Sequence, residues 1–367
     1  MTEHVILVYG DLLTKERLDT VRNSRRIEYT PKNCFQYVIF FPGLFHYKMA
    51  CADALWCTHI QPKEGHDDEN SLYQHIGVLR PDEMGKIVSK PGFRRVHDVL
   101  HHDVWASILD CWWIEAHHQN TVCATLEKFA ESEPTWDVII TMSHTIVRKY
   151  MATTDGLDAA RSKPLLYIDL CQAMNTRDIR RVEASFLPWI YIFKATGKHK
   201  YSSQISRFLN NLQFNSPESL SDIIQMNLLC NPTGKSVAFC AVDWLVERNN
   251  LYTKVIFPGG GPNGTLEHII KESPLIEIYH SCHVTMENTF HLQHRTIRHS
   301  APNTMKTIKK LSGCMNDKNV HLSKDGRKAL RVVPDQVSAG MTLMQEQKVV
   351  NEEDNSGFEI EGDDFLD

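Results

Sequence analysis

The distribution of strand and helix patterns along the chain constrains its fold more than any other feature of the sequence. Two short runs near the N-terminus, His4–Tyr9 and Phe35–Phe41, are rich in the β-branched and aromatic residues typical of buried strands. Beyond residue 70, apolar side chains recur mainly at helical spacing. We therefore predict a helix-rich α/β fold with a small early sheet and a large helical portion, and its most specific interpretation is a degenerate RNase-H-like core.

The helical periodicity is strong enough to place individual helices. We predict helices over Thr14–Arg25, Leu44–Thr58, Val96–Ala116, Cys123–Glu131, Trp136–Met151, Leu165–Met174, Arg180–Ala195, Tyr201–Phe214, Phe239–Asn249 and Ser273–Phe290. Thr253–Phe257 has the composition of a further short strand. Within the helix over Arg180–Ala195, the spacing of Trp189, Ile192 and Phe193 predicts a shared helical core.

Charge and composition divide the chain into three consecutive parts. We expect an α/β part over residues 1–150, a mainly helical part packed on it over residues 151–311, and a poorly ordered acidic tail over residues 312–367. The end of this tail, Gln345–Asp367, carries nine acidic side chains and one lysine. Because the whole chain has a net charge of −5, the residues before Gln345 carry a charge of +3.

The composition also excludes several classes of protein. Hydrophobic residues make up 42% of the chain, which is enough for a buried core and too many for a disordered protein. No apolar run approaches the roughly eighteen residues that a membrane helix needs. The first residues lack the basic region of a signal peptide, and ten cysteines occur without a CxxC pair. These features predict an intracellular protein, nuclear or cytoplasmic, that is not secreted and does not bind a membrane.

Three carboxylates are candidate ligands for a divalent metal ion. Asp11 follows the first predicted strand, where phosphoryl-transfer enzymes commonly place a ligand for Mg²⁺. Asp243 and Glu247 lie four residues apart on one face of a predicted helix. Simpler interpretations exist for each: Asp11 would cap the helix that follows it, and the pair would form salt bridges with Arg248 or Lys254.

The 19 histidines provide a second group of candidate ligands. His97 and His101 are one helical turn apart, and His291, His294 and His299 have a similar spacing, so either group could bind a metal from one helix. However, no nearby cysteine or carboxylate in the sequence completes a zinc-binding motif. Hydrogen-bonded or surface histidines are the simpler interpretation.

Basic residues form clusters that could contact the phosphates of nucleic acid. The candidate contacts are Arg22, Arg25, Arg26, Lys198, Lys200 and Lys254. Several of them are at helical spacing and near aromatic residues, an arrangement that nucleic-acid-binding surfaces use. Solvated helix faces have the same composition, and the sequence leaves both interpretations open.

Long stretches of the chain resemble one known family. They are His4–Asn33, Phe41–Trp56, Glu183–Leu209 and Asn231–Asn303, which includes the string NPTGKSVAFCAVDWLVERNNLYTKVIFPGGGPNGTLEHII. These stretches are similar to the basidiomycete family catalogued as domain of unknown function 6589, whose members resemble proteins encoded by mobile elements. Members are usually longer at the N-terminus, so the chain resembles the C-terminal part of one. The segment around Arg161–Tyr167 is shorter than in related chains.

The resemblance implies a protein derived from a mobile element, and it leaves open whether the chain is an enzyme. An active copy would carry out metal-dependent DNA cleavage or strand transfer, with Asp11, Asp243 and Glu247 as catalytic residues that bind Mg²⁺ or Mn²⁺. His46 or Lys254 would orient a phosphate. The alternative is a non-catalytic, domesticated or degenerate module that binds nucleic acid or protein.

Overall fold

The fold is known from a computed structural model, which describes residues 4–151, 159–248, 265–291, 303–322 and 330–346. These residues are mainly helical, and their short strands form two separate pairs. The described residues of Met1–His46 and Met226–Pro302 form one compact unit, and those of Tyr47–Gln225 and Asn303–Glu359 form a second. We call them unit 1 and unit 2. Each unit combines segments distant in the sequence, whereas the three parts expected from the sequence are consecutive.

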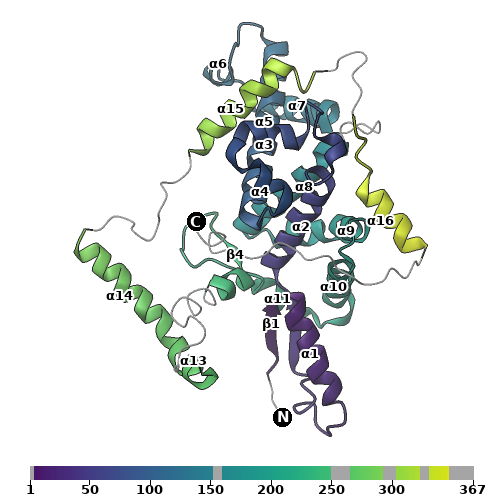
Figure 1. Cartoon of the computed structure of the whole chain (residues 1–367), viewed down its shortest axis with the longest axis vertical. Helices are drawn as coiled ribbons and strands as arrows, with labels where there is room; N and C mark the ends of the chain where they lie inside the picture. Colours follow the sequence, from purple (N-terminus) through teal and green to yellow (C-terminus); the bar gives the residue numbers. More distant parts are fainter. Residues whose placement is uncertain (1–3, 152–158, 249–264, 292–302, 323–329, 347–367) are drawn as a thin grey trace. The chain divides into compact units, whose positions relative to one another are not determined.

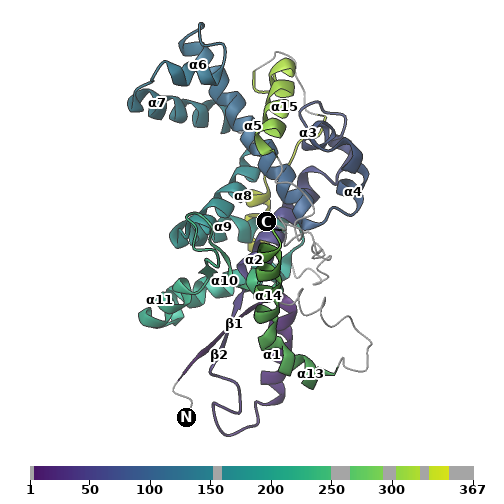
Figure 2. The same ribbon diagram turned by 90° about the vertical axis from the view of Figure 1, so that its left-hand side faces the viewer.

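Unit 1 is built on a strand–helix–strand motif (Figure 2). Strand β1 (Ile6–Gly10) pairs in parallel with β2 (Val38–Pro42), from Ile6 opposite Val38 to Gly10 opposite Pro42. Helix α1 (Leu12–Ser24) connects the two strands. Because the strands are parallel, their C-terminal ends lie at the same edge of the sheet. The register therefore places the start of α1 beside the residues that lead into the next helix.

The remaining described elements of unit 1 follow residue 226. A short antiparallel pair joins β3 (Leu229–Cys230) to β4 (Cys240–Ala241), and residues 242–248 are helical directly after it. Helices α13 (Leu266–Glu272) and α14 (Ile276–Thr289) come later. The expected helix-rich fold with a small early sheet is confirmed. The RNase-H-like core stays a prediction, because the described strands form only two separate pairs. The strand predicted at Thr253–Phe257 lies outside the described residues.

Unit 2 consists of helices. They are α3 (Leu72–Leu79), α4 (Met84–Ser89), α5 (Phe93–Gln119), α6 (Leu126–Glu131), α7 (Trp136–Ile146), α8 (Ala159–Thr176), α9 (Ile179–Ala195), α10 (His199–Asn210), α15 (Thr304–Lys318) and α16 (Gln336–Gln345). Helix α2 (Leu44–His59) begins in unit 1 and continues into unit 2, and α11 (Glu218–Met226) ends where unit 2 meets unit 1 in the sequence. In the part of the chain that the structure describes, no helix is both long and apolar enough to cross a membrane.

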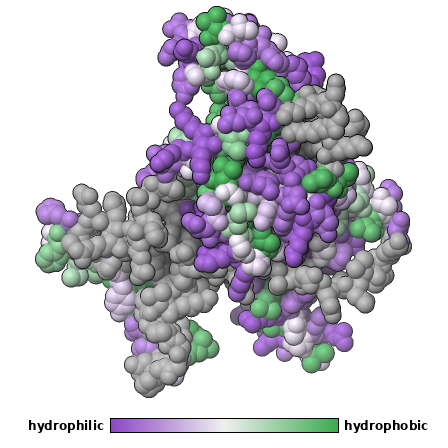
Figure 3. Space-filling model, turned by 45° about the horizontal axis from the view of Figure 1, so that its top comes forward, coloured by the Kyte–Doolittle hydropathy of each residue, from purple (hydrophilic) through white to green (hydrophobic). Residues whose placement is uncertain are grey.

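Aromatic side chains form the centre of unit 2. Trp189 of α9 is completely buried and lies 5.7 Å from the ring of Phe193, whose ring is 5.8 Å from that of Tyr47 on α2. Phe186 packs edge to face against both Tyr47 and Phe208 of α10. The core expected around Trp189 is thus present. The surface, in contrast, mixes hydrophilic residues with small separate hydrophobic areas in the view of Figure 3.

Part of the segment expected to be a poorly ordered tail is helical. Helix α15 extends to Lys318 and lies alongside α5 (Figure 1), with Leu311, Met315 and Val320 buried against Ala106. Helix α16 packs on α9. At Gly340 a Cβ atom would lie 2.0 Å from the carbonyl oxygen of Tyr191, so only glycine permits this close approach. Packing on α5 and α9 therefore orders the helical part of this stretch. Residues 347–367 lie outside the described residues.

Replacing Trp189 with alanine tests the aromatic core of unit 2. We expect Trp189→Ala to lower the free energy of unfolding by about 3–5 kcal/mol, because a large buried side chain leaves a cavity. Trp136, which is 71% exposed, is the matched control. Trp136→Ala should cost less than about 0.5 kcal/mol. Urea unfolding measures both variants, and equal small losses would contradict the assigned core.

Candidate functional site

The first turn of α2 is bound by a carboxylate from a distant segment. Asp243 accepts hydrogen bonds from the backbone N–H of Phe45, at 3.0 Å to each carboxylate oxygen, and from that of His46, at 3.1 Å. The N–H groups at the start of a helix lack partners within the helix, and the helix dipole favours an anion there. Asp243 is 2% exposed, so water does not compete for these bonds. The carboxylate therefore caps α2.

Gly43 makes room for this carboxylate. A Cβ atom at Gly43 would lie 2.1 Å from Oδ2 of Asp243 and 2.8 Å from its Cβ, far inside van der Waals contact. The residue before a helix often supplies a capping side chain, and here Asp243 takes that role instead. The N–H of Gly43 also donates to the carbonyl oxygen of Gly10 at 2.9 Å. This bond joins the end of β1 to the start of α2.

His46 connects the capping carboxylate to two further acids. Its Nδ1 lies 2.9 Å from Oδ2 of Asp243, and its Nε2 lies 3.9 Å from Oε1 of Glu247, which is too long for a direct hydrogen bond. Burial lowers the pKa of His46, but the hydrogen bond and charge of Asp243, with the charges of Glu247 and Asp11, raise that pKa above its ordinary value. When Nδ1–H donates to Asp243, neutral His46 has its lone pair on Nε2.

Asp11 lies at the same edge of the sheet because β1 and β2 are parallel. Its Oδ1 accepts hydrogen bonds from the backbone N–H and the hydroxyl of Thr14, both at 2.7 Å, so Asp11 caps α1. Among the described residues, its Oδ2 has no hydrogen bond. The charge of Asp11 makes the smallest of the contributions that raise the pKa of His46.

These observations define a site of four side chains in unit 1: Asp11, His46, Asp243 and Glu247. They come from the end of β1, the start of α2 and the segment after β4. No three of these side chains have ligand atoms that all lie within 4.8 Å of one another. Among the described residues, the group that meets this criterion lies elsewhere and contains none of the four. Metal binding by Asp11, Asp243 and Glu247 therefore stays a prediction.

The predicted nucleic-acid contacts at the end of α1 and directly after it differ in what their side chains do. Arg22 donates to the carbonyl oxygens of Phe35 and Val38, which fastens the connection between α1 and β2. Arg25 is exposed, and its guanidinium lies 5.1 Å from the centroid of the Phe35 ring. Arg26 is exposed as well. The exposed pair leaves a positive surface on unit 1, whereas Arg22 has a structural role.

The predicted lysine contacts lie elsewhere. Lys198 is buried in unit 2, where its ammonium group forms an ion pair with Asp53, so this side chain is not presented to a ligand. Lys200 is half-buried on α10. Lys254 lies outside the described residues, as do two of the spaced histidines, His294 and His299.

Asp243 is a site residue predicted from the sequence, but its role as the cap of α2 is visible only in the structure. No local motif predicts a hydrogen bond between residues 198 positions apart. One signal was available: Pro42 and Gly43 precede α2 without a capping Ser, Thr, Asp or Asn. A helix that begins in this way needs a partner from elsewhere for its first N–H groups.

The raised pKa of His46 predicts how stability depends on pH. Protonated His46 stabilises the fold fully below the unfolded-state pKa, near 6.5, and this contribution is lost as pH rises through the higher folded-state pKa. The stability difference between wild type and His46→Gln should therefore shrink with rising pH. Urea unfolding over a pH series measures it, with His4→Gln as an exposed control. A difference that grows with pH would contradict the assignment.

Comparison with known proteins confirms the family that the sequence resembles. The chain matches the model of a family described as "Family of unknown function (DUF6589)" over residues 1–299. This match includes all four residues of the site in unit 1. No curated protein and no solved structure shows significant similarity to the chain. The chain belongs to the family of unknown function DUF6589.

Proposed function

We propose that unit 1 carries a metal-assisted phosphodiester-cleaving site that acts on DNA. The observation that supports this proposal is the position of His46, which is held by buried Asp243 on one side and faces Glu247 on the other. A histidine oriented by a carboxylate through Nδ1 can take a proton at Nε2. The raised pKa makes Nε2 a stronger base than the nitrogen of an ordinary histidine.

Each side chain has a distinct role in the proposed reaction. Nε2 of His46 removes a proton from the attacking water, and Asp243 keeps the ring in the required tautomer and orientation. Asp11, through the Oδ2 that has no hydrogen bond among the described residues, and Glu247 supply carboxylate oxygens of the kind that Mg²⁺ and Mn²⁺ prefer. A bound ion would stabilise negative charge on the phosphate and on the leaving oxygen.

This assignment changes the role first predicted for Asp243. Both of its oxygens already accept hydrogen bonds from N–H groups at the start of α2. Binding an ion through the same oxygens would weaken those bonds inside a buried site, at a cost of about 1–3 kcal/mol for each N–H left unpaired. Asp243 is therefore proposed as the residue that positions His46, while Asp11 and Glu247 hold the ion.

DNA is the proposed substrate because of the family resemblance and the charge on unit 1. The exposed guanidinium groups of Arg25 and Arg26, directly after α1, could contact phosphates without reading the base sequence. We also propose that the chain is the C-terminal part of a basidiomycete protein derived from a mobile element. In that setting the reaction would be strand cleavage or strand transfer.

The second candidate function is a non-catalytic module that binds nucleic acid or protein. The arrangement of the acidic groups favours it, because among the described residues their oxygens do not all lie within 4.8 Å of one another, as the ligand atoms of a preformed metal site would. In this alternative Asp243 and His46 stabilise α2, and Asp11 caps α1. Neither role needs an ion.

Metal-dependent thermal stability separates the two functions. If Asp11 and Glu247 share an ion, millimolar Mn²⁺ should raise the melting temperature of the wild type by mass action. Glu247→Gln should abolish this shift, and Glu28→Gln, which removes an exposed acid elsewhere in unit 1, should retain it. Glu247 has no part in the capping of α2, so its replacement should leave the fold intact.

A cleavage assay completes this test. With Mn²⁺ present, wild type and Glu28→Gln should cut single- or double-stranded DNA, whereas Glu247→Gln and Asp11→Asn should not. A folded wild type whose melting temperature does not respond to Mn²⁺ would overturn the nuclease proposal. Retained DNA binding under those conditions would then favour the non-catalytic module.

A further inference from the structure

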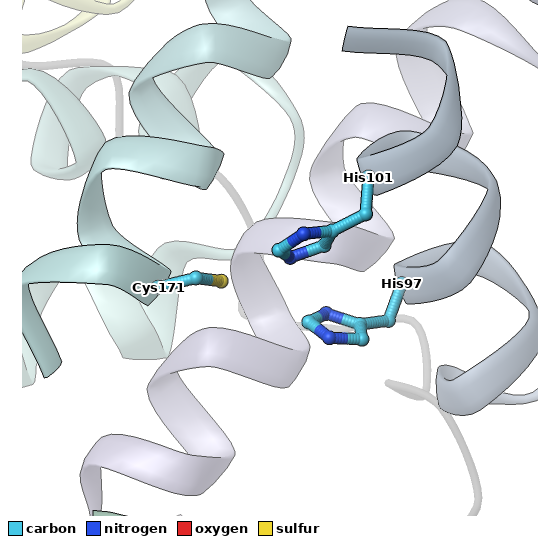
Figure 4. A group of neighbouring side chains, drawn as sticks. All are labelled: His97, His101 and Cys171. Carbon is cyan, nitrogen blue, oxygen red and sulfur yellow. The ribbon is translucent and has the colours of Figure 1, made fainter. Parts of the chain in front are cut away.

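A separate group of metal-ligating side chains lies in unit 2. His97 and His101 are one turn apart on α5, and Cys171 approaches them from α8 (Figure 4). One ring nitrogen of each histidine and the sulfur of Cys171 all lie within 4.8 Å of one another. The sequence shows the histidine spacing alone, because the cysteine that completes the group is distant along the chain.

The surroundings of these three residues suit a metal ion better than a simple packed core. The Nε2 atom of His101 is buried and has no hydrogen-bond partner among the described residues. An unpaired buried nitrogen destabilises the fold, and coordination to a metal would remove that penalty. Nδ1 of His97 lies 2.6 Å from the hydroxyl of Tyr167, one turn before Cys171 on α8. Histidines that bind metals commonly have their other nitrogen held in this way.

We propose that His97, His101 and Cys171 bind one transition-metal ion, with Zn²⁺ as the ion that two nitrogen donors and one sulfur donor fit. Tyr167 acts as a positioning residue that orients His97. Binding forms two nitrogen–metal bonds and one sulfur–metal bond, and the thiol of Cys171 releases its proton to solvent. The fourth position of a tetrahedral site would be filled by water.

Some protonation states and nearby charges at this site favour metal binding, and others oppose it. Burial keeps the pKa of His97 well below its ordinary value and lowers that of His101 to about 4, so both rings are neutral, as ligands must be. Burial also raises the pKa of Cys171 to about 11, and the positive charges of Lys48 and Arg94 lie near the cluster. The thiolate formed on binding offsets part of this positive charge.

Cobalt titration of the full chain tests the proposal. Co²⁺ takes the place of Zn²⁺ in such sites and gives a sulfur-to-cobalt charge-transfer band only when a cysteine binds it. We expect the chelator-treated wild type to develop this band, to saturate at one ion per chain, and to lose the band when Zn²⁺ is added. Cys171→Ser should abolish the band, and Tyr167→Phe should weaken binding roughly 10- to 100-fold.

Matched controls come from residues close to the cluster in sequence or type. His102→Gln changes the next histidine on α5, whose Nδ1 lies 2.6 Å from the carbonyl oxygen of Asp98, and should bind Co²⁺ like the wild type. Cys123→Ser changes another buried cysteine and should do the same. Cys230→Ser should also retain the band, although Cys230 and Cys240 form a close thiol pair in unit 1, with sulfurs 3.6 Å apart.

Two results would overturn the proposal. One is a folded wild type without a sulfur-to-cobalt band, an outcome that does not depend on any variant. The other is a band that persists in Cys171→Ser. This test is independent of the proposed nuclease site, because Mg²⁺ and Mn²⁺ prefer oxygen ligands. Glu247→Gln should therefore leave the cobalt spectrum unchanged, and Cys171→Ser should leave the response to Mn²⁺ unchanged.

Discussion

The Asp243 carboxylate accepts hydrogen bonds from two backbone N–H groups and one imidazole at the start of α2, and the candidate site depends on this interaction. It joins the segment after β4 to the end of the β1–β2 pair. Gly43 is needed for it, since any side chain there would overlap the carboxylate. The same carboxylate orients His46. One buried charge therefore both caps α2 and positions the proposed catalytic imidazole.

Paired histidine and aspartate side chains recur in this chain and account for part of its high histidine content. In unit 2, His321 lies 2.6 Å from Asp110, and both side chains are 2% exposed. His75 pairs with Asp103 at 2.5 Å. A buried carboxylate needs a donor, and an imidazole supplies one together with the means to accept or release a proton. His97 and His101 differ from these pairs, because a thiol rather than a carboxylate lies next to them.

The local elements could be predicted from the sequence, and their long-range partners could not. The helix expected over Arg180–Ala195 begins one residue earlier, at Ile179, and the two early strands are where their β-branched and aromatic residues indicate. These features depend on neighbouring residues. The capping of α2 by Asp243 and the approach of Cys171 to His97 depend on tertiary packing, which periodicity does not encode.

The buried ion pair of Lys198 is a second contact that could not be predicted from the sequence. A lysine in a basic, aromatic-rich stretch has the composition of a phosphate contact, but the fold places it against Asp53. Sequence patterns indicate which charges are present, whereas burial decides which of them reach a ligand. The helical part of the expected tail has a similar cause, since Met315 and Val320 find apolar partners on α5 that are distant in sequence.

The most direct test of the proposed site is a crystal structure of the protein soaked with Mn²⁺, with the anomalous signal of the ion recorded. We predict a peak between the carboxylates of Asp11 and Glu247, near Nε2 of His46, while Asp243 keeps its hydrogen bonds to the N–H groups of Phe45 and His46. The absence of a peak at this position would contradict the account. A peak bound by Asp243 with those hydrogen bonds broken would also contradict it.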